Sequence, residues 1–279
     1  MTVAEFTPIV FSAALLAGFV GSLTGLGGGV VVTPVLTLFL GVDLRYAIGA
    51  SLVSVIATSS GAAAAYVREG YSNIRIGMFL EIATTSGALF GAFLGTRIPA
   101  RYLSVLFGII LLQAAWQASP QRKHPNTPLP SDPLAKRLRL NGVYTTDDGA
   151  LQHYGAHRVK TGFGLMFGAG TISGLLGIGS GSLKVIAMDQ AMQIPFKVST
   201  ATSNFMIGVT AAASATVYLS RGYVDPGIAM PVMLGVLAGS TIGARYLARL
   251  SVPLLRRMFA IVVGLIGIEM IVNGITGNV

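Results

Sequence analysis

Two glycine-rich segments interrupt otherwise apolar stretches of the sequence, and their composition suits an anion. The first reads Gly-Leu-Gly-Gly-Gly at residues 25–29, and the second reads Gly-Ile-Gly-Ser-Gly at residues 177–181. Glycine at this density breaks a helix, so the helix that restarts beyond it presents unpaired N–H groups and its positive dipole end. Both features favour an anion. The sequence therefore predicts substrate contacts from Gly25, Gly27, Gly28, Gly29, Gly177, Gly179 and Gly181.

Uncharged polar side chains close to these breaks provide further hydrogen-bond donors. The predicted substrate contacts of this kind are Ser51, Ser180, Ser182, Ser203 and Asn204. Each serine has an alternative role, because a hydroxyl within a helix commonly bonds to the backbone of its own helix. The break glycines have an alternative too, since small residues permit close helix packing in membranes. The pairs Gly87 and Gly91, and Gly239 and Gly243, have the spacing of such packing glycines.

A lysine stands in an apolar environment directly beyond the second break. Lys184 lies three residues past Gly181, and the corresponding position after the first break is Val32. A charge at such a position is costly and marks a functional site by default. We predict that Lys184 supplies positive charge to an anion path. The alternatives are an ion pair with Asp189 or another acid, and snorkelling of the ammonium group to the membrane interface.

Two acidic residues lie within apolar stretches of the chain. By helical rise, Glu81 and Glu269 are about 9 Å from the ends of their expected helices, which is shallow enough to be interfacial. Acids in membrane segments often carry protons, so both residues are candidates for proton coupling. The alternative is a carboxylate at headgroup level that pairs with a neighbouring helix.

The composition requires that these residues be positioned by membrane-embedded helices. Of 279 residues, 53% are hydrophobic and 10% are charged, whereas a soluble domain is about one quarter charged. Continuous apolar runs of about 20 residues fit helices that cross about 30 Å of hydrocarbon, and they argue against an alternating barrel pattern. The spans are expected within residues 8–40, 46–67, 76–94, 102–118, 162–194, 198–219, 227–247 and 252–275. The chain contains no cysteine, which excludes disulfides and thiolate metal sites.

The chain repeats itself at an offset of 152 residues. This offset superposes Gly25, Gly27 and Gly29 on glycines of the second break, and it places Tyr66 and Tyr71 on Tyr218 and Tyr223. We therefore expect a first transmembrane repeat (residues 1–118) and a second (residues 161–279). The linker between them, residues 119–160, is basic, and alternating residues around Asp147-Asp148-Gly149 predict a β-hairpin on the membrane surface.

The topology depends on the run that contains each break. Residues 8–40 and 162–194 are each too long for one helix and too short for two spans. If each run dips into the membrane and returns, most basic residues share one face, as the positive-inside rule requires. With three spans and one re-entrant hairpin, each repeat crosses the membrane an odd number of times, so the two repeats would be inverted. Both termini would then be outside and the linker cytoplasmic. The helix that follows the first glycine break could also begin later, at Thr33-Pro34.

The resemblance to a known family rests on these motifs. A GLGGG hairpin near the N-terminus, a long Ser/Ala-rich span, the same unit repeated with GIGSG, and a basic linker ending in a Tyr-containing hairpin resemble the TauE/SafE sulfite exporters. The resemblance covers nearly the whole chain. It implies a duplicated bacterial inner-membrane permease that moves sulfite, an organosulfonate or a related small anion. Ile178 and Ser180 depart from the first copy's motif, which makes the two breaks unequal.

Other function classes fit less well. A lipid-phosphate enzyme within the membrane would require converging carboxylates, histidines and arginines, and the apolar runs contain few such residues. We therefore do not expect an enzyme or a cofactor. An anion channel is the main alternative to a permease, and saturable transport would distinguish the two. The expected partners are the anion and membrane lipid, with no nucleic acid, and a homodimer is possible.

Overall fold

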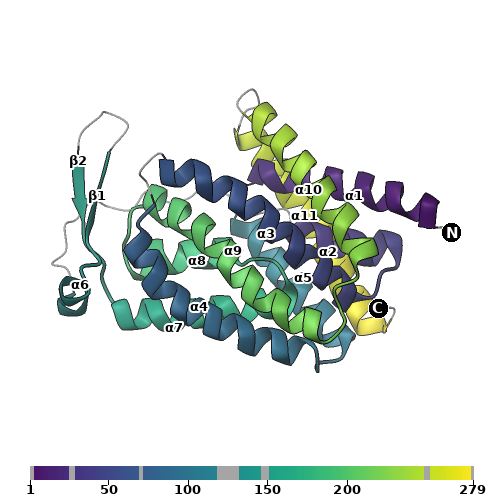
Figure 1. Cartoon of the computed structure of the whole chain (residues 1–279), viewed down its shortest axis with the longest axis horizontal. Helices are drawn as coiled ribbons and strands as arrows, with labels where there is room; N and C mark the ends of the chain where they lie inside the picture. Colours follow the sequence, from purple (N-terminus) through teal and green to yellow (C-terminus); the bar gives the residue numbers. More distant parts are fainter. Residues whose placement is uncertain are drawn as a thin grey trace.

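The computed structural model describes residues 3–24, 29–68, 72–117, 132–145, 151–247 and 252–277, and most of these residues are helical. The elements of the first half are α1 (Val3–Thr24), α2 (Gly29–Pro34), the π-helical turn η1 (Val35–Phe39), α3 (Leu44–Arg68), α4 (Ile74–Gly95) and α5 (Ala100–Gln117) (Figure 1). The linker contributes α6 (Pro133–Arg137), β1 (Gly142–Thr145) and β2 (Leu151–Tyr154). The second half comprises α7 (Val159–Leu176), α8 (Gly181–Ile186), the π-helical turn η2 (Ala187–Ala191), α9 (Phe196–Ser220), α10 (Pro226–Leu247) and α11 (Val252–Thr276).

The element bounds reproduce the internal repeat. An offset of 152 residues carries α2 onto α8, η1 onto η2, α3 onto α9 and α4 onto α10 with the same first and last positions. The helix that follows the first break, α2, begins at Gly29, so the alternative start at Thr33-Pro34 is wrong. The π-helical turn after Pro34 is not a local effect of proline, because η2 follows Ile186 at the equivalent place.

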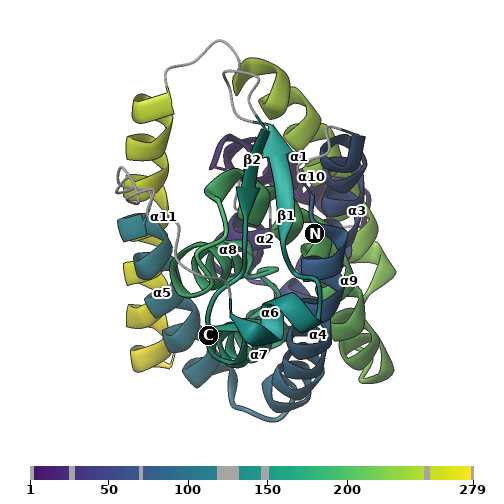
Figure 2. The same cartoon turned by 90° about the vertical axis from the view of Figure 1, so that its left-hand side faces the viewer.

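Helix α5 and its counterpart α11 pack in opposite directions. Gly274 near the end of α11 lies against Arg101 at the start of α5, and Gly267 lies against Gly108. The two helices stand side by side at the left of Figure 2.

Helices α3 and α9 also cross in opposite directions. Arg45 at the start of α3 donates to the Tyr223 hydroxyl beyond the end of α9 (3.5 Å). The backbone N–H of Asn73, beyond the end of α3, donates to Thr202 Oγ1 near the start of α9 (3.0 Å). The central helices of the two halves are therefore antiparallel.

These contacts define two ends of the helical body. At the linker end, the Asn73 side chain donates to the Tyr154 hydroxyl of β2 (2.8 Å), which joins the α3–α4 loop to the hairpin. Burial raises the pKa of the Tyr154 hydroxyl, and the bond from Asn73 opposes this shift. At the opposite end, Arg45 donates to the carbonyl oxygen of Ile98 (3.0 Å), so the start of α3 meets the end of α4.

The segment before each break runs parallel to a helix of the other half. Phe11 and Leu15 of α1 lie against Gly235 and Gly239 of α10, which begins just after Tyr223 at the opposite end. Helix α3 begins at the same end of the helical body. The chain therefore leaves that end along α1 and returns to it through α2 and η1, which makes this segment a hairpin. In the second half, α7 packs along α4 in the same way, from the linker end.

Glycines set the closeness of these parallel pairs. A Cβ at Gly87 or Gly91 of α4 would collide with the carbonyl oxygens of Phe167 or Thr171 of α7, and one at Gly239 would collide with that of Leu15. The packing role predicted for Gly87, Gly91 and Gly239 is therefore confirmed.

The linker hairpin is confirmed and packs on the helical body. Strands β1 and β2 are antiparallel, with Val143 paired to His153, and the predicted turn at Asp147-Asp148-Gly149 lies outside the described residues. Figure 1 shows α6 and the hairpin at one end of the molecule. Ala135 and Leu140 are buried in an apolar cluster that includes Met188 and Met192.

Two described helical segments are long and apolar enough to cross a membrane by themselves, Ile74–Gly95 and Pro226–Gly243. The central helices α3 and α9 have 25 residues each. Their buried faces are hydroxyl-rich, including Ser51, Ser54, Ser203, Thr210 and Ser214. Such polar groups suit a protein interior better than a lipid-facing surface.

Candidate functional site

The two glycine breaks meet beside the crossing of α3 and α9. Ser51 of α3 places its hydroxyl 2.9 Å from the carbonyl oxygen of Gly177 and 3.2 Å from that of Gly29. Ser51 is fully buried, and its single hydroxyl hydrogen serves one of the two carbonyls at a time. One side chain of the first half therefore connects the breaks of both halves.

The second break requires left-handed backbone conformations. Gly177 ends α7 with φ +67°, and Gly179 has φ +68°. A Cβ at Gly179 would lie 3.0 Å from Ile207 and 3.3 Å from Val55, which occupy equivalent positions of α9 and α3. The loop thus lies between equivalent residues of α3 and α9.

Ser180 is the residue of the second break best placed to offer a hydrogen bond. Its backbone is also left-handed (φ 44°), and 3% of its surface is exposed. Within the described residues, the Ser180 hydroxyl has no hydrogen-bond partner, as is true of the nearby Ser173 hydroxyl. A buried hydroxyl without a partner is unfavourable, and a ligand would remove that cost.

Two of the predicted serines bond to backbone. Ser203 of α9 donates to the carbonyl oxygen of Gly181 (3.1 Å), which repeats the Ser51–Gly29 bond of the first half. These two hydroxyls bond to the first residues of α2 and α8. Their role as ligands of the substrate stays a prediction. Asn204 is half-buried beside Ser203. Gly25, Gly27, Gly28 and the side chain of Ser182 lie outside the described residues.

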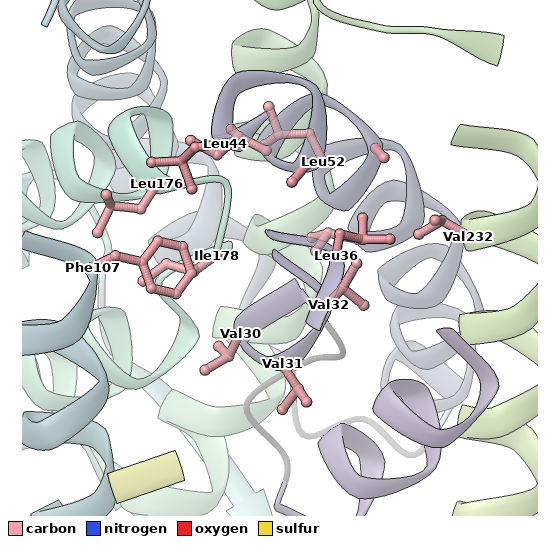
Figure 3. Packing of buried hydrophobic residues seen from close by; sticks show 14 of the residues in the cluster. Val30, Val31, Val32, Leu36, Leu44, Leu52, Phe107, Leu176, Ile178 and Val232 are labelled. Carbon is pink, nitrogen blue, oxygen red and sulfur yellow. The ribbon is translucent and has the colours of Figure 1, made fainter. Parts of the chain in front are cut away.

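Apolar side chains surround the breaks. Figure 3 labels Val30, Val31 and Val32 of α2, Ile178 of the second break and Phe107 of α5 within one buried cluster. Such a wall lowers the local dielectric, so each polar group inside it interacts more strongly with a charge.

Lys184 is fully buried and joins a polar chain that links three helices. Its Nζ atom donates to Thr210 Oγ1 of α9 (2.6 Å), and Thr210 Oγ1 lies 2.7 Å from Glu81 Oε1 of α4. The snorkelling alternative for Lys184 is wrong, because none of its surface is exposed. The acid that it approaches through Thr210 is Glu81.

The two predicted acids occupy different environments. Glu81 has 6% of its surface exposed and also accepts a hydrogen bond from Thr85 (2.9 Å), so its side chain faces the interior of the protein. Glu269 is exposed on α11, a helix that packs on α5. Sequence reasoning did not select Thr210, because a threonine in an apolar helix has no distinguishing signal of its own.

The chain matches a family of membrane proteins over most of its length. Residues 10–270 match the sulfite exporter TauE/SafE family. The chain is 30% identical over 270 residues to the probable membrane transporter protein YunE of Bacillus subtilis, with 94% of this chain and 96% of that protein aligned. A probable membrane transporter protein of Xylella fastidiosa is 28% identical over 92% of this chain and 91% of its own. No solved structure shows a significant match.

The fold and these similarities define a helical membrane transporter. The chain belongs to the sulfite exporter TauE/SafE family.

Proposed function

We propose that this transporter is a permease for a small anion, sulfite or a related organosulfonate, that passes between the two glycine breaks. The observation that carries the proposal is the Ser51 hydroxyl, which connects Gly29 and Gly177 at the centre of the molecule. Ser180 offers a buried donor there, and Lys184 lies one helical turn further along α8, with its backbone N–H bonded to the Ser180 carbonyl (3.1 Å). The proposed substrate contacts are those named from the sequence.

We further propose that the two repeats, residues 1–118 and 161–279, are inverted across the bacterial inner membrane. The antiparallel contacts of α3 with α9 and of α5 with α11 support this arrangement. The return of each break segment to its own end of the body supports re-entrant hairpins. The basic linker, residues 119–160, would then be cytoplasmic.

Residue-specific accessibility tests this topology. Tags at residues 2 and 279 should both be reached from the periplasm of intact cells, and a tag beside Lys136 should be reached only after the inner membrane is permeabilised. Cytoplasmic termini would contradict the re-entrant model, because each repeat would then cross the membrane an even number of times.

Thermal unfolding in a panel of anions tests the proposed substrate class. A ligand that binds only the folded state stabilises it by about 2.7 kcal/mol at 100 times its dissociation constant. We expect sulfite, sulfoacetate or ethanesulfonate to raise the unfolding temperature of the purified protein, with gluconate as the inert control. If no sulfur-containing anion stabilises the protein, the proposed substrate class is wrong.

Ser180→Gly tests whether the hydroxyl contributes to that stabilisation. The substitution removes the donor and relieves the left-handed strain, so the unliganded protein should remain folded while its response to the anion weakens. Ser240→Ala is the matched control, because Ser240 is a half-buried serine of α10 that bonds to its own helix at Leu237. An unchanged anion response in Ser180→Gly would remove Ser180 from the site.

A further inference from the structure

Lys184, Thr210 and Glu81 form one buried chain that contains a cation, a hydroxyl and a carboxylate. The exposed fractions are 0% for Lys184, 0% for Thr210 and 6% for Glu81. Removing one partner from a buried charge pair leaves the other uncompensated, which is strongly unfavourable. Separating the Lys184 ammonium group from Glu81 would therefore leave the buried carboxylate without its counter-charge.

The Thr210 hydroxyl has two alternative acceptors. It accepts from Lys184 Nζ, and its single hydrogen can go to Glu81 Oε1 (2.7 Å) or to the carbonyl oxygen of Met206 in its own helix (2.9 Å). An ionised Glu81 competes well for that hydrogen, because charge-assisted hydrogen bonds are the stronger ones. A protonated Glu81 competes less well, and Thr210 then turns to Met206.

Glu81 has one carboxylate oxygen free to take a proton. Oε1 accepts from Thr85 and Thr210, whereas Oε2 is buried and has no hydrogen-bond partner among the residues that the structure describes. Apart from Lys184, the charged residues on the elements around Glu81 are Arg75, Arg158, Lys160, Asp189 and Lys197. Asp189 of η2 is half-buried, and the other four are exposed.

Lys184 is within reach of the proposed anion. Its position is one helical turn beyond Ser180, and side chains on a helix lean toward the N-terminal turn, which here is the break. The four-carbon stem of lysine allows its ammonium group to move between neighbouring partners. An anion at the break therefore competes with Thr210 and Glu81 for the same ammonium group.

We infer that the Lys184–Thr210–Glu81 chain couples the uptake of one proton to the binding of each anion, with Thr210 as the positioning residue. This inference rests on the anion permease proposed above. When the anion draws Lys184 away from Thr210, Glu81 loses its counter-charge and takes a proton at Oε2 from the aqueous phase that supplied the anion. Lys184 keeps its own protons. Anion and proton are released together on the other side, so each cycle moves no net charge for a monovalent anion.

The internal repeat limits the stoichiometry to one such site. The positions equivalent to Lys184, Thr210 and Glu81 are Val32, Thr58 and Met233, and none of these side chains carries a charge. Thr58 bonds to the carbonyl oxygen of Ser54 in its own helix (3.0 Å). It therefore provides a matched control for Thr210.

Proteoliposomes with a pH-sensitive dye in the lumen test the coupling. The probe is an inward gradient of ethanesulfonate, which is fully ionised near neutral pH and cannot itself carry the proton. With the wild-type chain, we expect ethanesulfonate entry and lumen acidification in a ratio of one to one, with initial rates unchanged by a clamped membrane potential. Glu81→Gln should allow ethanesulfonate exchange without acidification.

Thr210→Val separates coupling from folding, because it retains both charges and nearly the same volume. We expect it to lose most of the acidification per anion, whereas Thr58→Val should retain the wild-type ratio. Ethanesulfonate entry with wild-type acidification in both Glu81→Gln and Thr210→Val would overturn the coupling while leaving the permease intact. Failure of the wild-type chain to move ethanesulfonate would overturn both proposals.

Discussion

Replacing Gly179 with valine should abolish transport while the protein still inserts and folds. Gly179 has φ +68°, and a left-handed conformation costs a residue with a Cβ roughly 1–2 kcal/mol, with a further penalty for a β-branched side chain. The added side chain would also press on Ile207 and Val55 at the crossing of α3 and α9. The backbone of the second break would therefore shift, or the valine side chain would occupy the space beside it. We expect anion flux in liposomes to fall to the level of protein-free vesicles.

Two control variants identify the cause of that loss. Gly222 also has a positive φ (+76°), but it follows the end of α9 and has open space around it, so Gly222→Val measures strain alone. Gly168→Ala in α7 introduces a Cβ where nothing lies within 4 Å. Both controls should retain transport. Loss of Gly179→Val from the membrane, rather than loss of its flux, would indicate a packing role for the break.

Replacing Lys184 with methionine should strongly destabilise the protein, with more effect than any exposed substitution. The change removes the counter-charge of the buried Glu81, and breaking a buried pair in this way costs about 3–5 kcal/mol. We expect a lower thermal unfolding temperature in detergent and lower yield. Lys160→Met at the exposed start of α7 should change the stability by within about 0.5 kcal/mol.

A double-mutant cycle assigns the effect to the Lys184–Glu81 interaction. The combined variant Lys184→Met, Glu81→Leu removes both charges, so it should regain most of the stability that Lys184→Met loses. Additive losses in the double variant would show that the two charges do not depend on each other, and would assign the cost of Lys184→Met to lost packing.

The sequence determined the membrane class, the duplication, the two breaks and the linker hairpin. Each of these rests on local composition or on a direct comparison of one half with the other. Gly25–Gly29 and Gly177–Gly181 mark the breaks because glycine disfavours helix wherever it clusters. The repeat fixes the element bounds, since equivalent sequences form equivalent helices, as α3 and α9 do.

Only the tertiary structure decided which residues meet. Thr210 and Glu81 are 129 residues apart, and no local pattern identifies a threonine as the bridge between a lysine and a glutamate. The depth expected for Glu81 came from its position along one helix, whereas its burial depends on how α4, α8 and α9 pack. Likewise, Ser51 lies near Gly29 by repeat geometry, but its contact with Gly177 exists only because α3 of the first half packs against the second break. Periodicity along a chain specifies which segments are helices, and the packing between helices then determines which polar groups must satisfy one another.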